Sequence, residues 1–187
     1  MQLICPILVD AERFVSEERH RRMRPPHDCP HCGRHGALWA LGYYARHLSI
    51  LSRRDTLHLK VRRFRCRWCR KTVSLLPWFA QPYRLIQNET IHRFATRQRG
   101  HLDVLHWTPL LVRYWRRFER WIPELSKVTG RFIGRGPPRS QPEAWWLRIV
   151  DCWGGPEEAT AFLIGSFRIT LFGRYRCHHP NPLPGNR

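Results

Sequence analysis

Long apolar runs are missing from this sequence. Its most apolar stretch, ATAFLIGSF at residues 159–167, is followed at once by Arg168 and is much shorter than the roughly 20 residues that a transmembrane helix needs. The start, MQLICPILVDAERF, has an apolar run without the basic residues that open a secretory signal peptide. These absences argue against a membrane protein and predict a cytoplasmic one.

Lysine and acidic residues are also scarce. Of the 33 basic residues only Lys60, Lys71 and Lys127 are lysines, and 14 acidic residues leave a net charge of +19. A GC-rich genome would favour arginine codons over lysine codons, but it would not create the surplus of charge. The surplus predicts a polyanionic partner, nucleic acid above all, and arginine suits phosphate because its planar fork binds two oxygens at once.

Cysteine, by contrast, is present in a pattern. The segments CPHC at residues 29–32 and CRWC at residues 66–69 are two CxxC pairs, and in a reducing compartment such pairs are metal ligands more often than disulfides. Two CxxC turns complete one tetrahedral site, so we expect one structural Zn²⁺ ion. The expected ligands are Cys29, Cys32, Cys66 and Cys69. A redox pair, unrelated thiols and an iron–sulfur cluster are the alternatives.

Other potential ligands follow no clear spacing. Three histidines lie beside the first pair: His27, His31 and His35. One of them could replace a cysteine as ligand, but surface or phosphate contacts are the plainer role. Three cysteines stay unassigned, with two adjacent histidines near the last of them: Cys5, Cys152, Cys177, His178 and His179.

The sequence between the cysteine pairs predicts a long β-hairpin. Residues 37–48 and 56–65 have strand character, and Leu57, Leu59 and Val61 alternate with polar residues. The second strand and its turn, KVRRFRCRWCRK, concentrate basic residues that can follow a phosphate backbone, although a solvated face is the plainer interpretation. The nucleic-acid contacts expected here are Lys60, Arg62, Arg63, Arg65, Arg67, Arg70 and Lys71.

An amphipathic helix is expected from Thr108-Pro109, a favourable helix start, to Ile122, just before Pro123. At about 100° per residue its apolar side chains share one arc, and four arginines share the opposite arc. These arginines, which either contact nucleic acid or form a solvated face, are Arg113, Arg116, Arg117 and Arg120.

Together these patterns predict an α+β fold in which a zinc-ribbon β-hairpin domain precedes a small helical, helix-turn-helix-like domain. Further helices are expected around residues 11–22, 83–99, 101–107, 142–155 and 156–172, with a strand as the alternative at the end of the last. The expected parts are an N-terminal arm (1–26), a zinc ribbon (27–82) that ends in a linker around Pro77 and Pro82, a helix-turn-helix-like segment (83–125), and a loop with C-terminal helices and a disordered tail (126–187).

The pattern CPHCGRHG…GYYAR…KVRRFRCRWCRKTVSLLP resembles the N-terminal zinc-binding region of bacterial insertion-sequence transposases and related uncharacterised transposon-associated proteins. It covers residues 27–83. The resemblance places Cys29, Cys32, Cys66 and Cys69 at the zinc-ligand positions, with Val73 where the family has an aromatic residue. It implies a helix-turn-helix next, for which TPLLVRYWRRFERW resembles a recognition helix, and double-stranded DNA as the partner.

Catalytic chemistry is not expected. A ribonuclease-H-like transposase domain holds two metal ions with a carboxylate triad, but the carboxylates here are scattered and about 60 residues remain after the ribbon and helices. His58 is the one candidate for an HNH nuclease, without an evident partner. We therefore expect a zinc-stabilised DNA-binding accessory or regulator, nucleoid-associated in a bacterium. The alternatives are an RNA- or ribosome-binding zinc ribbon, a truncated transposase remnant and, last, a small metal-dependent nuclease.

Overall fold

A computed structural model describes residues 1–7, 9–50, 56–82, 84–96 and 108–175. The chain divides into two compact units. Of the described residues, the first unit comprises 1–7, 9–50, 56–82 and 84–86, and the second comprises 87–96 and 108–175. The first unit is built on a sheet and the second on helices, so the described residues have the predicted α+β character.

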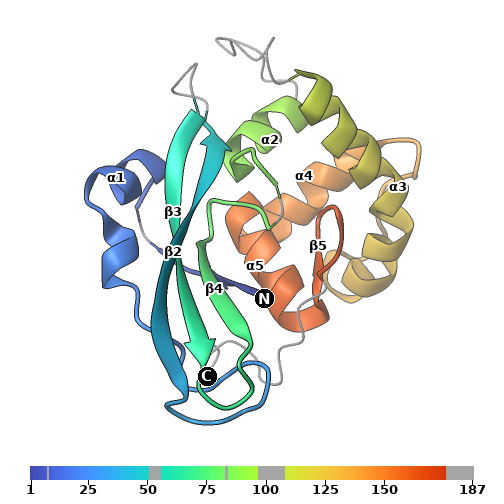
Figure 1. Cartoon of the computed structure of the whole chain (residues 1–187). Coiled ribbons are helices and arrows are strands. Elements are labelled where there is room, and N and C mark those ends of the chain that lie inside the picture. The colour runs from blue at the N-terminus through green and yellow to red at the C-terminus, as the bar shows by residue number, and fades with distance from the viewer. Residues whose placement is uncertain (8, 51–55, 83, 97–107, 176–187) are drawn as a thin grey trace. The chain divides into compact units, whose positions relative to one another are not determined.

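The sheet of the first unit has four strands in the order β1-β4-β3-β2 (Figure 1). β2 (Leu38–Ser49) and β3 (Thr56–Cys66) form an antiparallel hairpin. β4 (Thr72–Pro77) is antiparallel to β3, and β1 (Gln2–Cys5) is parallel to β4. The predicted hairpin is confirmed, and each of its strands ends within one residue of the expected position.

The buried side of β3 changes along the strand. Successive side chains of a strand point to opposite faces. Leu57, Leu59 and Val61 are buried on one face, here called the Leu59 face, whereas Phe64 and Cys66 are buried on the other, the Phe64 face. The Leu59 face packs into one core with Leu48, Leu76, Phe79 and Phe14. The Phe64 face packs into a second core with Leu3, Cys29, Leu38, Val73 and Leu75. One hairpin therefore supports two hydrophobic cores.

The N-terminal residues belong to the sheet and do not form the expected arm. The apolar run that begins the chain forms β1, in which Gln2 pairs with Ser74. Helix α1 (Ala11–Ser16) begins at Asp10, whose Oδ1 accepts a hydrogen bond from the Arg13 N–H at 2.7 Å. It ends well before Arg22, and a 3-10 turn, η1 (Arg19–Arg22), follows the left-handed residue Glu18 (φ 48°).

β4 (Thr72–Pro77) overlaps the linker that was expected around Pro77 and Pro82. All five residues after Thr72 in this strand are buried. Pro77 is its last residue, where a missing N–H is tolerated. Strand pairing with β3 and burial on both faces therefore override the linker signal.

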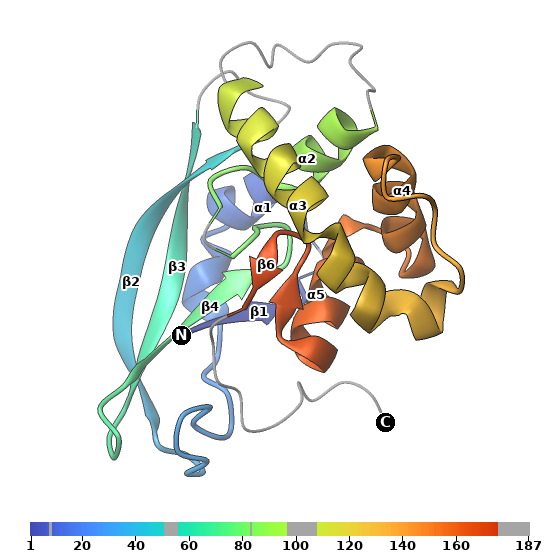
Figure 2. The same cartoon turned by 90° about the vertical axis from the view of Figure 1, so that its right-hand side faces the viewer.

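The second unit packs its helices around Trp146. They are α2 (Asn88–Ala95), α3 (Thr108–Ile133), α4 (Pro142–Cys152) and α5 (Pro156–Phe167), followed by the two-residue strands β5 (Ile169–Thr170) and β6 (Gly173–Arg174) (Figure 2). The Trp146 ring lies 5.2 Å from that of Phe118 and 6.0 Å from that of Phe172, and its Nε1 donates to His92 Nδ1 at 3.1 Å. The two C-terminal helices and the short strand after them are confirmed, and α2 lies within the helix expected at 83–99. The helical turn expected at 101–107 and the tail lie outside the described residues.

α3 continues through Pro123, so the predicted end at Ile122 and the loop expected from residue 126 are wrong. A proline inside a helix costs about 3 kcal/mol. Beyond it, however, the buried face continues with Leu125, Thr129 and Ile133, and burying an aliphatic side chain contributes about 1.5–3 kcal/mol. Packing of this last stretch thus offsets the proline. Among the described residues, no helix combines the length and apolarity that a bilayer crossing requires.

Two glycines of the second unit should respond oppositely to alanine. A Cβ on Gly136 would overlap the buried ring of Trp145, whereas a Cβ on Gly130, within α3, would meet nothing within 4 Å. We expect Gly136→Ala to destabilise by about 1–3 kcal/mol through overpacking. Gly130→Ala should stabilise by about 0.5–1 kcal/mol. Urea unfolding followed by tryptophan fluorescence measures both, and equal effects would contradict the packing of Trp145.

Stability should also depend on the protonation of Glu157 at the start of α5. Burial, with Glu158 and Glu89 nearby, raises the pKa of Glu157 from 4.5 to about 7. Between these values the folded chain binds more protons than the unfolded one, so stability falls as pH rises. Glu157→Gln should therefore raise the melting temperature at pH 8 more than at pH 5. Glu119→Gln, which removes an exposed carboxylate of α3, is the control for the loss of one charge, and an equal gain for Glu157→Gln at both pH values would contradict the burial of Glu157.

Candidate metal centre and charged surfaces

The two CxxC segments form turns of the same design at one end of the first unit's sheet (Figure 1). In the first turn the Cys29 N–H donates to the Arg34 carbonyl at 2.9 Å, and the Gly33 N–H donates to the Cys29 carbonyl at 2.8 Å. The segment between the turn and β2 is tied to the second turn, because the Arg67 N–H donates to the Ala37 carbonyl at 2.9 Å.

The second turn makes the same two hydrogen bonds, one between residues five positions apart and one between residues four positions apart. The Cys66 N–H donates to the Lys71 carbonyl at 3.0 Å, and the Arg70 N–H donates to the Cys66 carbonyl at 3.1 Å. Gly33 (φ 71°) and Arg70 (φ 60°) occupy the same left-handed position. Arginine pays a steric cost there that glycine does not, so this turn is held in place by its surroundings.

The four thiols converge. The Sγ atoms of Cys29 and Cys69 lie 3.7 Å apart, as do those of Cys32 and Cys66, and all four lie within 4.8 Å of one another. Bonds of about 2.3 Å from a tetrahedral zinc ion to sulfur would set the sulfurs about 3.8 Å apart. These cysteines form no disulfide and can hold a metal ion. They are the predicted ligands, and the neighbouring histidines do not join them.

Protonation of the thiols opposes metal binding to different extents. Burial raises the pKa of Cys29 to about 12, and burial also raises the pKa of Cys69. Burial acts in the same direction on Cys66, but the backbone N–H groups of Cys69 and Trp68 and the neighbouring thiols lower its pKa to about 7. A metal ion needs thiolates, so its binding must release protons from this cluster.

The residues beside the cluster are basic and aromatic. Arg34 stacks over Trp68, with 4.2 Å from its Cζ to the ring centroid, and links the two turns. Trp68 is 64% exposed. The Arg65 Nε donates to the Arg70 carbonyl at 3.2 Å, which supports the strained turn. Arg34 was not among the contacts predicted from the sequence, although aligning CPHCGR with CRWCRK places it opposite Lys71, which was.

The other histidines and cysteines have separate surroundings. His27 and His35 stack with ring centroids 5.9 Å apart, and the His35 Nδ1 lies 3.0 Å from Asp28 Oδ1. His58 packs edge-on against His47, its cross-strand neighbour. Burial raises the pKa of Cys5, in β1, to about 12, and Cys152 is exposed at the end of α4. Cys177, His178 and His179 lie outside the described residues.

The basic residues of β3 do not form one row. Arg63 and Arg65 share the Leu59 face, whereas Lys60 and Arg62 share the Phe64 face. Lys60 also lies 3.7 Å from a carboxylate oxygen of Glu18. One phosphate backbone therefore cannot follow the whole set along the strand. The cations of the turns are all exposed and are here called the knuckle cations: Arg34, Arg67, Arg70 and Lys71.

The arginines of α3 lie opposite its buried residues, as predicted. Arg113, Arg116, Arg117 and Arg120 are all exposed. The apolar arc contains the buried side chains Leu111, Tyr114, Phe118 and Ile122. Arg117 differs from its neighbours because its Nε donates to the Phe172 carbonyl at 2.6 Å. Arg117 therefore holds the turn between β5 and β6 against α3.

A family model described as a domain of unknown function (DUF6431) matches residues 29–107. The matched segment begins at the first cysteine of the cluster and ends just before α3, and it covers less than half of the 187 residues. The chain is similar to this family over the metal-centre turns, the hairpin, β4 and α2. No curated protein and no solved structure matches the chain.

We expect purified protein to contain one metal ion per chain. Cys66→Ser should lose most of it and lower the melting temperature of the first unit, because the cluster shares a core with Phe64. Cys152→Ser, which changes an exposed thiol outside the cluster, is the matched control and should keep both. Elemental analysis and near-ultraviolet circular dichroism make the measurement. A metal-free preparation with an unchanged spectrum would show that the thiols do not build a metal centre.

Proposed function

We propose that the protein is a zinc-stabilised nucleic-acid-binding protein that contacts double-stranded DNA. The observation that carries the proposal is the segregation of its charge. The knuckle cations and the arginines of α3 are exposed and pair with no carboxylate of the described residues. Guanidinium groups in this state are available to phosphate.

Local pairing of the acidic residues supports this proposal. In the first unit, Glu17 binds Arg13 and Arg19 near α1, and Glu18 binds Arg21 in the same region. Asp28 lies against His35. Glu17 and Glu18 are thus engaged near α1, and Asp28, beside the first turn, faces His35 and none of the knuckle cations. In a chain with a net charge of +19, these cations are left for a polyanion to approach.

Zinc is the metal that best suits the four-cysteine centre. A set of four thiolates favours zinc or iron over hard cations, and a multi-iron cluster would separate its cysteines further because cluster atoms lie between them. Four protein ligands leave no position for substrate or water, so the ion is structural. Two knuckles on a long hairpin support the assignment of a zinc ribbon.

α3 is the element proposed to enter a DNA groove. Its 26 residues extend about 39 Å, and the width of a helix fits the major groove. Arg113, Arg116 and Arg120 lie on its exposed arc. α2 precedes it, as in a helix-turn-helix, although 12 residues separate Ala95 from Thr108, more than the usual turn of about 3–4 residues.

The relation to transposases is proposed from the sequence pattern of residues 27–83. We infer an accessory or regulatory protein without a catalytic domain, associated with bacterial DNA. RNA is the second candidate partner, favoured by the exposed ring of Trp68 beside Arg34, because unpaired bases stack on such aromatic and guanidinium planes.

The arginines of α3 provide a direct test. Arg113→Ala together with Arg116→Ala should reduce the salt slope of duplex binding by about 2, because each lost phosphate contact removes about 0.9 from it. Arg135→Ala with Arg139→Ala removes the same charge from the exposed loop after α3 and is the control. Anisotropy of labelled duplex DNA, single-stranded DNA and structured RNA, at salt from about 50 to 200 mM, is the measurement.

Equal losses in both double variants would mean that α3 contributes only to the general charge of the protein. Equal, salt-labile binding of the wild-type protein to all three nucleic acids would contradict a preference for duplex DNA. Tighter binding of RNA would favour the second candidate.

A further inference from the structure

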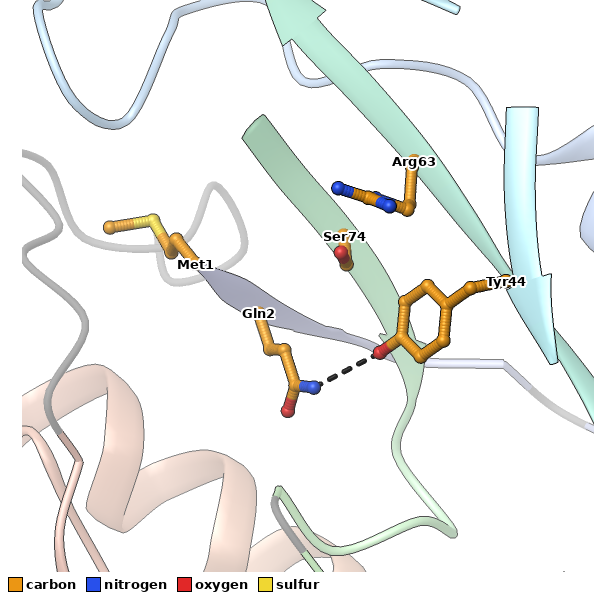
Figure 3. A pocket seen from close by; sticks show the side chains of 5 residues that line it. All are labelled: Met1, Gln2, Tyr44, Arg63 and Ser74. Carbon is orange, nitrogen blue, oxygen red and sulfur yellow. Dashed lines mark hydrogen bonds between the residues drawn. The ribbon is translucent and has the colours of Figure 1, made fainter. Parts of the chain in front are cut away.

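A polar pocket opens on the Leu59 face of the first unit's sheet, beside the apolar core. Its volume is about 380 Å³, and it is lined by Met1, Gln2, Tyr44, Arg63 and Ser74 (Figure 3). No carboxylate is among the lining residues. None of these side chains except Arg63 was a candidate from the sequence.

Strand pairing brings these side chains together. Ser74 of β4 is the direct neighbour of Gln2 in β1 and of Arg63 in β3. The next strand, β2, places Gly42 opposite Arg63, so three polar side chains and one glycine form a row across four strands. Neighbours in such a row point to the same face, which explains why one pocket draws on residues 2, 63 and 74.

An irregularity in β2 leaves room above this row. The pairing of β2 with β3 shifts between Ala40 and Gly42, which leaves Leu41 as an extra residue. Gly42 has φ 121°, and a Cβ added there would meet nothing within 4 Å. The next residue of β2 on the same face, Tyr44, has its ring centroid 5.8 Å from the Arg63 Cζ. The space above Gly42 is thus open, and Tyr44, the next residue on this face, lines the pocket.

The polar groups that line the pocket are mainly donors. The Gln2 Nε2 donates to the Tyr44 hydroxyl oxygen at 3.0 Å, which directs the phenolic proton elsewhere. The Ser74 hydroxyl and the Arg63 guanidinium make no hydrogen bond or ion pair with any described residue. A half-buried guanidinium with unused N–H groups beside two hydroxyls is complementary to an oxyanion.

We propose that this pocket binds one phosphate group of a bound nucleic-acid strand, with Arg63 as the bidentate ligand and Ser74 and Tyr44 as hydroxyl donors. This inference rests on the proposed nucleic-acid binding and deepens it: α3 is proposed to contact duplex DNA, and this pocket is proposed to hold an unpaired strand. The same side chains would bind any phosphate group. The ligand is therefore either free phosphate or a phosphate of a nucleic-acid strand, and the experiment must distinguish the two.

The surroundings of the pocket favour the strand. Two residues further along β3, Arg65 places a second cation on the same face, opposite Trp39 of β2. Trp39 is 39% exposed. An aromatic ring next to successive cations is the arrangement on which bases of a single strand stack. The pocket therefore begins a polar path that runs along the face toward the metal centre.

The test uses Arg63→Gln and Ser74→Ala, with Arg62→Gln as the matched control. Arg62→Gln removes the same charge from the adjacent residue of the same strand, but Arg62 lies on the Phe64 face. Metal content and melting temperature check that each variant is folded. Two probes are used on each: inorganic phosphate, followed by amide NMR shifts at Ser74 and Gly42, and a labelled single-stranded oligonucleotide at varied salt.

Phosphate at millimolar concentration should shift both amides in the wild-type protein and in Arg62→Gln, but not in Arg63→Gln, and the shift should weaken in Ser74→Ala. Arg63→Gln should bind the oligonucleotide about tenfold more weakly, with a salt slope smaller by about 0.7, and Arg62→Gln should retain more of the affinity.

If phosphate shifts the amides but the oligonucleotide binds Arg63→Gln as it binds Arg62→Gln, the pocket takes free phosphate and the assignment to a strand is overturned. If phosphate causes no shift and the two variants bind alike, the pocket itself is overturned, while DNA binding through α3 stands. A wild-type protein that binds no nucleic acid would refute the proposed function and the strand assignment. The phosphate titration would then still decide whether the pocket is an anion site.

Discussion

The alternation of side chains along β3 is the constraint from which the organisation of the first unit follows. Leu57, Leu59 and Val61 bury one face of the hairpin, and Phe64 and Cys66 bury the other. Each face is therefore apolar over one part of its length and polar over the rest. The Phe64 core brings Cys66 toward Cys29, and the polar part of the Leu59 face holds Arg63 and its pocket. A shift of pairing by one residue would exchange these sides and separate both sites.

The cysteine cluster connects this sheet to the loops at its end. Both turns close with the same pair of backbone hydrogen bonds, and the second does so although Arg70 must adopt a left-handed conformation. The N–H groups that donate to Cys66 lower its pKa to about 7 despite burial, so part of the cost of gathering negative charge is met by the backbone. The exposed Arg34, stacked over Trp68, adds positive charge beside the cluster. In this way a local turn geometry, a hydrophobic core and a charged surface all meet at one end of the unit.

Positive charge has different uses in different parts of the molecule. Arg13, Arg19 and Arg21 pair with carboxylates near α1, and Arg117 and Arg148 donate to backbone carbonyls inside the second unit. Arginines with such partners support the fold. Arg63 lines the pocket and Arg113 and Arg116 are exposed, and none of the three has a carboxylate or carbonyl partner among the described residues. The function proposed for the protein depends on the second group, because only unpaired guanidinium groups gain by meeting phosphate.

The sequence by itself determined the features that depend on neighbouring residues. The CxxC spacing predicted the thiol cluster, the period-2 pattern predicted the hairpin, and the helical period separated Arg113 and Arg116 from Tyr114 and Phe118. Only the tertiary structure decided that residues 2–5 join the sheet, because their pairing with β4 spans about 70 residues and leaves no local signal. It also decided that residues 72–77 form a buried inner strand, because their burial depends on β1 and β3 on either side. It also decided that α3 passes Pro123, since the compensating burial of Leu125 and Ile133 depends on the other helices. The phosphate pocket belongs to the same class: Gln2, Tyr44, Arg63 and Ser74 come from four strands, and only their register places them side by side.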